Sequence, residues 1–533
     1  MADVSGLPGS HDRFKGARRA GLIAGAALAL AACATPNGDG SWTLPGEDGG
    51  RIYQPPTVAA VVDGDYPGRS AVEGSIALTL SDGSAREQPL NPLIAVNQTL
   101  LTDDRPASPD RPLNGLPVLL KDNIETADMP TTAGSLALVD NAPGRDAPLV
   151  TRLRDAGAVI LGKTNLSEWA NIRSSESISG WSAVGGQTRN PYDPERTPCG
   201  SSSGSAVAVA SGLAPAAIGT ETDGSITCPA SVNGVVGFKP TVGLVSRTHI
   251  VPIAHSQDTA GPITTTVEDA AIVLTVLAGS DPLDPATAEA DARKVDYRAA
   301  LDADSLRGAR IGVMRFLLPS YSEETRAEFE RSLAAMREAG AELVEITEAP
   351  ADMRAIGGWE LTVLLTELKH DLNAYLASTD PQQVKTRTLA DVIAFNAAEP
   401  RETVLFGQDL FERAEATGGL GDTAYVEARA RSLQAAGPDG IDRMMADNNV
   451  VALIAPTTSR AWTNDPDDED EMQGSASRLA AVAGYPHLTV PMGFDRGMPV
   501  GISFIAGRWE DAKVLSLGYA FERRTQARRA PIP

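Results

Sequence analysis

The 533-residue chain has few of the residues from which metal sites are built. It contains three cysteines, Cys33, Cys199 and Cys228, with no CxxC pair. Its five histidines form neither an HExxH motif nor any other short pair. Without these patterns, a structural zinc site and a metal-dependent mechanism lack support. We therefore expect no metal site and no cofactor.

Positive charge is scarce as well. The chain carries 46 Lys and Arg against 69 Asp and Glu, a net charge of −23. A nucleic-acid groove needs clustered Lys and Arg to neutralise phosphates, so we expect no nucleic-acid partner. The acidic run Asp465 to Glu471 lacks the spacing and glycine of an EF-hand loop. We interpret this run as a solvated loop, with a calcium site as the alternative.

The N-terminus has the pattern of a signal for export. Residues 13–19 are basic, and residues 20–32 form a short run of Gly, Ala, Leu and Ile that ends at Cys33. This order predicts a signal peptide over residues 1–33, because the apolar run is too short to span a bilayer comfortably. The sequence Leu-Ala-Ala-Cys at its end resembles the lipobox of bacterial lipoproteins, which implies cleavage before Cys33 and lipidation of that residue.

Two alternatives stay open at this end of the chain. An ordinary cleaved signal would leave Cys33 incidental, and Arg18-Arg19 leaves the choice between general secretion and a twin-arginine route undecided. In each case we expect an exported protein of the cell envelope or periplasm, and the lipid implied for Cys33 would be its only attachment to a membrane. Residues 34–87, rich at first in Gly, Pro, Asp and Ser, are interpreted as a tether and an N-terminal lead-in.

From residue 88 onward, helical and strand patterns alternate. Residues 149–156 predict an amphipathic helix that ends at Gly157, followed by a buried strand over 158–161. Further strands are predicted at 311–314, 343–346 and 450–455, with a helix between the first two. This alternation favours a single large α/β domain over residues 88–533 with a largely covered sheet.

Three short segments contain candidate catalytic residues. The first is an apolar strand, residues 115–120, that ends in Lys121 and is followed at once by polar turn residues. A lysine on the surface would be the ordinary outcome. At the end of a buried strand, however, desolvation lowers a lysine pKa and makes the neutral amine available as a base.

The other two segments supply serines. Residues 199–205 read CGSSSGS and open directly into an apolar helix, so Ser201 and its neighbours form a tight loop and not a flexible linker. Residues 219–225 read GTETDGS, a turn that can direct successive backbone N–H groups into one space. A developing oxyanion needs such donors, and Ser225 follows them directly.

Together these segments resemble the amidase signature family. The lysine strand, the Gly/Ser loop and the TDxGGS-like turn occur in the family's order, and further similar landmarks extend over roughly four fifths of the chain. The resemblance implies a mixed central β-sheet wrapped by many α-helices. It also implies that Lys121 is the base, Ser201 the cis-serine and Ser225 the nucleophile, with an oxyanion hole formed by the backbone N–H groups of Thr222, Asp223, Gly224 and Ser225.

The departures from the family pattern point to one branch. Asp223 stands where many members have a second glycine, Cys199 and Ser203 replace glycines of the middle loop, and Thr227 replaces a common arginine. These variants are similar to bacterial peptide amidases, which implies a peptide amide or amino-acid amide as substrate. Asn171 and Asp223 are candidate substrate-binding residues, although Asp223 could instead cap its own turn.

Several other expectations complete the interpretation. We expect no catalytic role for His255 or His487, which lie in segments that resemble structural parts of the family. We expect Cys199 and Cys228 to be buried free thiols, although export permits a disulfide. Residues 281–445 are expected to be helical and to shape the acyl-side pocket. The alternative functions are an amidotransferase A-subunit-like enzyme and a catalytically inactive, membrane-tethered binding protein.

Overall fold

The computed structural model describes residues 35–36, 42–44, 51–53, 55–85, 88–101, 111–464 and 472–531. The predicted signal peptide with Cys33 and the acidic run 465–471 lie outside the described residues. Within them, a mixed sheet of eleven strands forms the centre of the molecule. Its order is β13 (Glu342–Ile346), β12 (Arg310–Met314), β14 (Ala452–Pro456), β16 (Met498–Ile505), β15 (His487–Asp495), β10 (Val236–Lys239), β11 (Thr259–Thr264), β9 (Ala216–Glu221), β5 (Pro117–Lys121), β6 (Val159–Thr164) and β4 (Leu93–Val96).

The sheet combines parallel and antiparallel neighbours. Strand β12 pairs in parallel with β13 and β14, and β5 pairs in parallel with β6 and β9. The strands between these two groups run antiparallel. The family's mixed sheet and the single large domain are therefore confirmed. The predicted strands at 158–161, 311–314, 343–346 and 450–455 correspond to β6, β12, β13 and β14.

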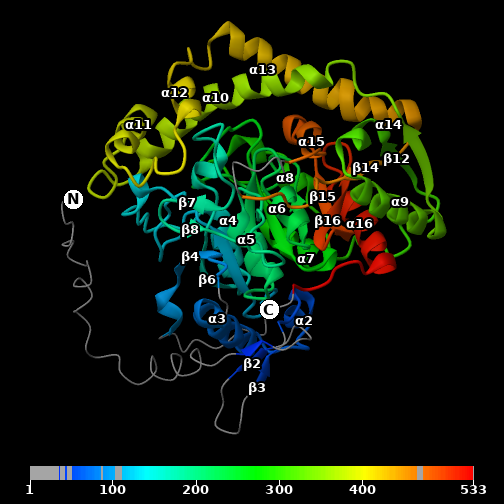
Figure 1. The fold of residues 1–533 in the computed structure, drawn as a ribbon, viewed down its shortest axis with the longest axis horizontal. Helices are drawn as coiled ribbons and strands as arrows, with labels where there is room; N and C mark the ends of the chain where they lie inside the picture. Colours follow the sequence, from blue (N-terminus) through cyan, green and yellow to red (C-terminus); the bar gives the residue numbers. More distant parts are fainter. Residues whose placement is uncertain are drawn as a thin grey trace, which may run out of the picture.

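Helices cover the sheet (Figure 1). They are α2 (Val58–Val62), α3 (Gly68–Ala85), α4 (Pro148–Asp155), α5 (Ser203–Ala210), α6 (Thr227–Val232), α7 (Val267–Leu277), α8 (Ala290–Arg293), α9 (Glu323–Glu338), α10 (Met353–Ser378), α11 (Leu389–Ala398), α12 (Asp409–Glu415), α13 (Thr423–Ala436), α14 (Arg443–Asn448), α15 (Ser477–Ala483) and α16 (Asp511–Thr525). In Figure 1, α10 and α13 run side by side along the upper edge, and the two helices are in contact.

Alternation along the strands divides the core between the two faces of the sheet. In β5, Val118 and Leu120 pack in one cluster with helices α4, α7, α9 and α16. Leu119 points the opposite way and packs with α3 and α5. Because successive side chains of a strand point to opposite faces, Lys121 follows Leu119 toward the α5 side. The strand pattern therefore determines which helix layer the lysine meets.

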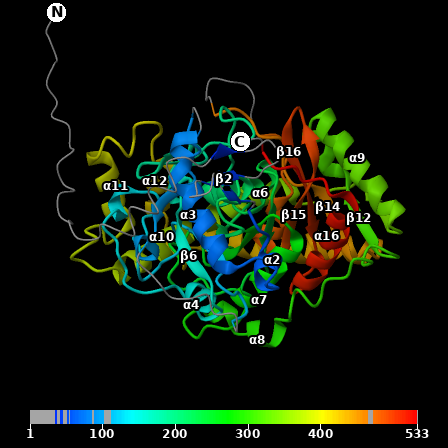
Figure 2. The same cartoon turned by 90° about the horizontal axis from the view of Figure 1, so that it is seen from below.

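The lead-in predicted for residues 34–87 includes two helices that pack against the domain. Val58, Val61 and Ala71 belong to the main core cluster. The N–H of Ala59 donates to the carboxylate of Asp269 at 2.8 Å, which ties α2 to α7. Seen from below, α2 and α3 lie across the body of the domain (Figure 2). Part of the predicted lead-in is therefore helical.

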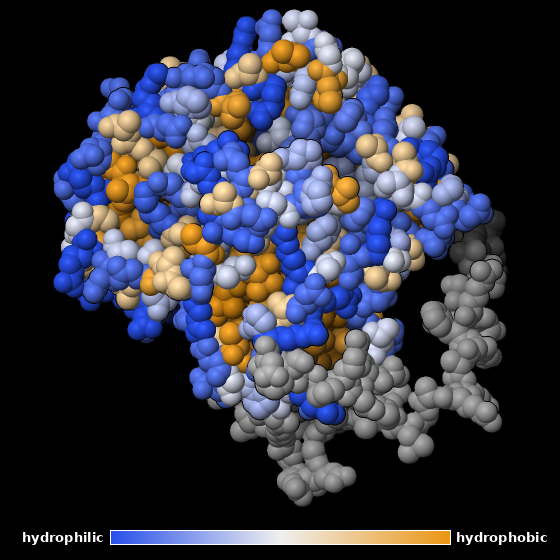
Figure 3. Space-filling view, turned by 180° about the vertical axis from the view of Figure 1, so that it is seen from behind, coloured by the Kyte–Doolittle hydropathy of each residue, from blue (hydrophilic) through white to orange (hydrophobic). Residues whose placement is uncertain are grey.

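The face of the molecule seen in Figure 3 is mainly polar. On the face shown in Figure 3, hydrophilic residues predominate and apolar residues gather in smaller patches. Among the described residues, no helix combines the length and apolarity needed to cross a membrane.

Candidate active site

The position of Lys121 follows from the pairing of two parallel strands. Leu120 of β5 lies opposite Ile218 of β9, so the carboxyl ends of both strands reach the same edge of the sheet. Lys121 is the last residue of β5, and Thr220 lies one residue before the end of β9. The parallel register therefore brings the lysine amine next to Thr220.

The amine of Lys121 is fully buried and has three polar neighbours. Its Nζ lies 2.7 Å from Ser201 Oγ, 2.8 Å from Thr220 Oγ1 and 3.2 Å from the Thr220 carbonyl oxygen. Burial lowers the pKa of Lys121 to about 7, although the negative charges of Asp258 and Glu221 oppose this shift. A neutral amine can donate its two protons to Thr220 and direct its lone pair at Ser201.

Ser201 lies in a tight loop just before α5. The Gly200–Ser201 peptide bond is cis. A side chain at Gly200 would not fit, because an added Cβ would lie 2.1 Å from Ser167 Oγ. The next residue, Ser202, exchanges hydrogen bonds with the backbone of Thr220, at 3.1 and 3.2 Å. The loop is thereby fixed to the strand end beside Lys121.

Ser225 lies in the turn between β9 and α6. The buried carboxylate of Glu221 accepts hydrogen bonds from the N–H groups of Ile226 and Thr227, at 2.7 and 2.9 Å. Gly224 has a φ of +79°, a left-handed conformation that favours glycine. The N–H of Ser202 donates to the carbonyl of Ser225 at 3.1 Å. The predicted nucleophile is therefore held directly beside the loop of Ser201.

The backbone N–H groups of the turn are available to a ligand. Within the described part of the chain, those of Asp223, Gly224 and Ser225 have no hydrogen-bond acceptor. Ser225 itself is 8% exposed, so the turn is open to a small group while most solvent is excluded. Unused donors next to a serine are what the oxyanion of an acyl-transfer reaction requires.

The expectation of free thiols at Cys199 and Cys228 is wrong. The two residues form a disulfide, with Cα atoms 6.0 Å apart. Cys199 precedes Ser201 by two residues, and Cys228 follows Ser225 by three. The sequence permitted this bond but could not position the two loops relative to each other. The disulfide therefore joins covalently the two segments that contain the serines.

Asn171 lies next to the same loop. An added Cβ at Gly200 would be 3.3 Å from Asn171 Nδ2. Asn171 has a φ of +70° and follows two further residues with positive φ, Trp169 and Ala170. Its Nδ2 has a long hydrogen bond of 3.4 Å to Ser179, whereas its buried Oδ1 has no hydrogen-bond partner in the part of the chain that the structure describes. The amide oxygen is thus free to receive a hydrogen bond beside Ser201.

Asp223 does not cap its turn through Oδ1, which is buried and has no hydrogen-bond partner within the described residues. Its Oδ2 lies 3.9 Å from Nε of Arg478, and the same Nε lies 3.1 Å from Glu360. Burial, and secondly the charge of Asp223, raise the pKa of Glu360 to about 8. The guanidinium of Arg478 therefore lies between the carboxyl groups of Glu360 and Asp223.

Sequence reasoning missed the residues that support the turn from the far side. Asp258 accepts from Thr222 Oγ1 at 2.6 Å and from the N–H of Ile253 at 2.8 Å. Gln257 Nε2 donates to the Thr222 carbonyl at 3.2 Å and to Glu360 at 3.0 Å. These contacts connect segments far apart in the chain, and no local pattern in the sequence indicates them.

The histidines are placed away from the reacting groups. His487 is fully buried, and its Nε2 lies 2.6 Å from Ser503 Oγ. Burial and the nearby charge of Lys239 lower the pKa of His487 to about 3, so the ring stays neutral. His255 pairs with Asp371 on α10 at 2.8 Å. Among the described residues, neither histidine has a hydrogen bond to a candidate catalytic residue.

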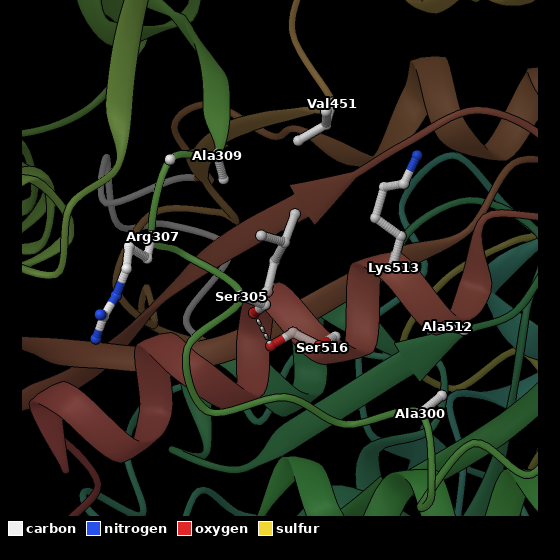
Figure 4. Close-up of a pocket in the computed structure, with 10 residues that line it drawn as sticks. Ala300, Ser305, Arg307, Ala309, Val451, Ala512, Lys513 and Ser516 are labelled. Carbon is white, nitrogen blue, oxygen red and sulfur yellow. Dashed lines mark hydrogen bonds between the residues drawn. The ribbon is translucent and has the colours of Figure 1, made fainter.

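A surface pocket lies elsewhere in the molecule (Figure 4). Ser305, Arg307 and Lys513 line it, and Ser305 Oγ donates to the Ser516 carbonyl at 2.8 Å. It lies between the segment preceding β12 and helix α16, and includes no candidate catalytic residue. The hollow is therefore not part of the active site.

Comparisons with known proteins match the chain to amidases. Residues 94–515 match the Amidase family model. The native peptide amidase from Stenotrophomonas maltophilia is a similar solved structure, with 48% sequence identity and a TM-score of 0.81. The match covers 89% of this chain and 96% of that one.

Curated relatives extend beyond peptide amidases. The "Probable amidase" of Arabidopsis thaliana is 40% identical over 428 residues, which are 79% of this chain and 78% of the relative. The A subunit of glutamyl-tRNA(Gln) amidotransferase from Roseiflexus castenholzii is 37% identical, over 80% of this chain and 86% of the relative. The family model, the curated relatives and the solved structure therefore all indicate chemistry on amides.

The disulfide leads to a direct prediction. Replacing both Cys199 and Cys228 by alanine should lower the free energy of unfolding by about 2–4 kcal/mol, since the bond closes a loop between residues separated by 29 positions. We also expect kcat to fall more than KM rises, because the bond positions the serines. Chemical denaturation and steady-state kinetics measure the two effects.

A Cys33→Ala variant is the matched control, and it should change neither quantity. If the double variant kept the stability and kcat of the unmodified chain, the bond would have no positioning role. Titration with a thiol reagent under denaturing, non-reducing conditions checks the pairing, which predicts no free thiol from Cys199 or Cys228.

Proposed function

Because the chain belongs to the amidase family of C–N hydrolases, we propose that it is a serine amidase. Its substrates are the C-terminal amides of peptides or amino-acid amides, and its products are the acid and ammonia. The observation that carries this proposal is the buried 2.7 Å contact between Lys121 Nζ and Ser201 Oγ, beside the turn of Ser225. The likeness to a peptide amidase supports the substrate class.

The proposed mechanism uses Lys121, Ser201 and Ser225 as a relay. Neutral Lys121 takes the proton of Ser201 Oγ, which in turn takes the proton of Ser225 Oγ as that oxygen attacks the amide carbon. The proton then returns through Ser201 to the departing nitrogen, so ammonia leaves and an acyl-enzyme remains. Water repeats the sequence and releases the acid. General-base assistance of this kind contributes about 10²–10⁴-fold.

The turn 222–225 holds the oxyanion in this proposal. The N–H groups of Asp223, Gly224 and Ser225 are unused, and that of Thr222 completes the set proposed for the hole. Loss of one such donor typically costs about 10²–10³-fold in kcat. Thr222 is fixed through both its side chain and its carbonyl, so the hole is formed before substrate arrives.

Two unpartnered oxygens can orient the substrate. Among the described residues, Oδ1 of Asn171 and Oδ1 of Asp223 are buried without a hydrogen-bond partner, and the Nδ2 of Asn171 lies near Gly200, the residue before Ser201. Both atoms are acceptors only, so each suits an N–H group of a peptide or of a carboxamide. An unpaired buried acceptor is costly, and a substrate amide would remove this cost on binding. We assign both residues to substrate binding.

The two alternative functions would require other features of the protein. An amidotransferase subunit would act with partner subunits and deliver its ammonia to a second reaction; the similarity to the A subunit of such an enzyme keeps this function as the second candidate. A catalytically inactive binding protein would not need a neutral lysine next to a serine. The predicted export signal and the buried Lys121–Ser201 contact favour a stand-alone hydrolase.

Release of ammonia tests the proposed reaction itself. The purified protein should release ammonia from peptide amides without ATP or a partner, and Ser225→Ala should abolish this release because the nucleophile is removed. A panel of peptide amides, amino-acid amides and aryl amides, followed by ammonia assay, measures the preference. Ser305→Ala, outside the site, is the control. Full activity of the Ser225 variant would refute the assignment.

A further prediction concerns the pH dependence of kcat/KM. The base must be neutral, so kcat/KM should rise with pH through about 7, where Lys121 loses its proton, and then level off. Asp258→Asn should shift this rise to lower pH, because the carboxylate charge that raises the pKa of Lys121 is lost. The pH profile of kcat/KM provides the measurement.

Asp380→Asn, an exposed substitution beyond the end of α10, is the charge-matched control for the pH profile. It should leave the midpoint unchanged. A rise that stayed in place in the Asp258 variant would show that a group other than Lys121 controls the activity.

We also propose that the enzyme is exported and anchored by a lipid on Cys33. The basic and apolar segments of residues 13–32 support export, and the disulfide between Cys199 and Cys228 suits an oxidising compartment. In a bacterial host, Cys33→Ser should abolish labelling by radioactive palmitate and move the protein from the membrane to the soluble fraction. Labelling that persisted in this variant would contradict lipidation at Cys33.

A further inference from the structure

One face of α10 contacts the loop that supports the oxyanion turn. The N–H of His255 donates to Asp371 at 2.8 Å, and the N–H of Ser256 donates to Glu367 at 3.0 Å. Gln257 continues the series through its 3.0 Å bond to Glu360. Three carboxyl groups of a single helix therefore hold three consecutive residues of the loop.

The outer end of this contact contains two histidines and two carboxylates. His255 Nδ1 lies 2.8 Å from Asp371 Oδ2, and His370 Nδ1 lies 2.8 Å from Asp371 Oδ1. The remaining ring nitrogen of His255, Nε2, lies 3.5 Å from Glu367 Oε1. One possible ligand atom from each of His255, His370 and Asp371 lies within 4.8 Å of the others.

We propose that His255, His370 and Asp371 bind a divalent transition-metal ion, with Zn²⁺ as the reference ion. The ligand atoms come from two separate segments, since His370 and Asp371 lie on α10 whereas His255 lies in the loop. The ion would therefore join the loop to the helix. This role is separate from the amidase reaction, in which the ion has no step.

The chemistry of the donors selects the class of ion. Two imidazole nitrogens and a carboxylate oxygen suit Zn²⁺, Ni²⁺ or Cu²⁺, whereas Mg²⁺ and Ca²⁺ prefer oxygen ligands alone. Zinc–nitrogen bonds are about 2.0–2.1 Å long. Because the three candidate ligand atoms already lie within 4.8 Å of one another, small side-chain movements can bring them onto one ion. Glu367 can supply a fourth oxygen or orient His255.

The surroundings allow an ion to enter and allow the ligands to adjust. The side chains of His255 and His370 are 44% and 57% exposed. Asp371 is 12% exposed and is held by the His255 backbone, and Glu367 is fixed by Tyr425 Oη at 2.8 Å. The carboxylates are thus preorganised, whereas the two imidazoles are mobile enough to close on an ion.

The test measures metal binding directly. Tag-free protein is freed of metal with a chelator and titrated with Zn²⁺ in a calorimeter. We expect one strongly bound Zn²⁺ per chain, and a rise of Tm in its presence because only the folded chain brings the ligands together. His255→Ala and His370→Ala should each weaken binding by at least about tenfold. Nitrogen hyperfine structure in the electron paramagnetic resonance of bound Cu²⁺ should indicate two imidazoles.

Two controls distinguish this site from the acidic surface. His249→Asn removes another histidine that lies 3.7 Å from a carboxylate, and asparagine tolerates its φ of +62°. This variant should bind Zn²⁺ like the unmodified chain. Strong binding that persisted in the His255→Ala/His370→Ala double variant would overturn the proposal, as would the absence of strong binding to the unmodified chain. His370 is so exposed that its variant should fold, which circular dichroism checks.

Discussion

The site depends on a buried lysine amine that has no carboxylate partner among the described residues. There, the hydrogen bonds of Lys121 go to a serine hydroxyl and to the two oxygens of Thr220. Lys163, one strand away and equally buried, is instead paired with Asp122 at 2.9 Å. Because a charge is costly to bury without a partner, Lys121 readily gives up its proton, and its pKa falls to about 7. Lys163 therefore has a carboxylate that stabilises its charge, whereas Lys121 has the environment of a candidate base.

This arrangement requires that several loops meet at one edge of the sheet. The parallel pairing of β5 and β9 places Lys121 beside Thr220, and strand alternation directs the lysine toward α5. Glu221, the last residue of β9, then binds the start of α6 through two N–H groups. The disulfide adds a covalent link between the two serine segments. Each of these contacts fixes the position of a loop, and the sheet determines where the loops lie relative to one another.

The sequence was sufficient for the parts of the site that lie in short, local patterns. Lys121, Ser201 and Ser225 each stand in a distinctive segment, and β6, β12, β13 and β14 follow from apolar runs between helical patterns. The disulfide and the contacts of Asp258 with Thr222 could not be derived, because they depend on how distant loops meet. For the same reason, His255 and His370 are isolated in the sequence although α10 brings them together in space.

Helix α10 connects the region between β13 and β14 to the turn 222–225. Glu360 on this helix holds Gln257, which supports the carbonyl of Thr222 in the oxyanion turn. Glu360 also shares Arg478 with Asp223, so the electrostatic setting of that turn depends on α10 and α15 together. A change in this helical layer can therefore alter the position of the backbone N–H groups in the turn 222–225, because Glu360 reaches that turn through Gln257.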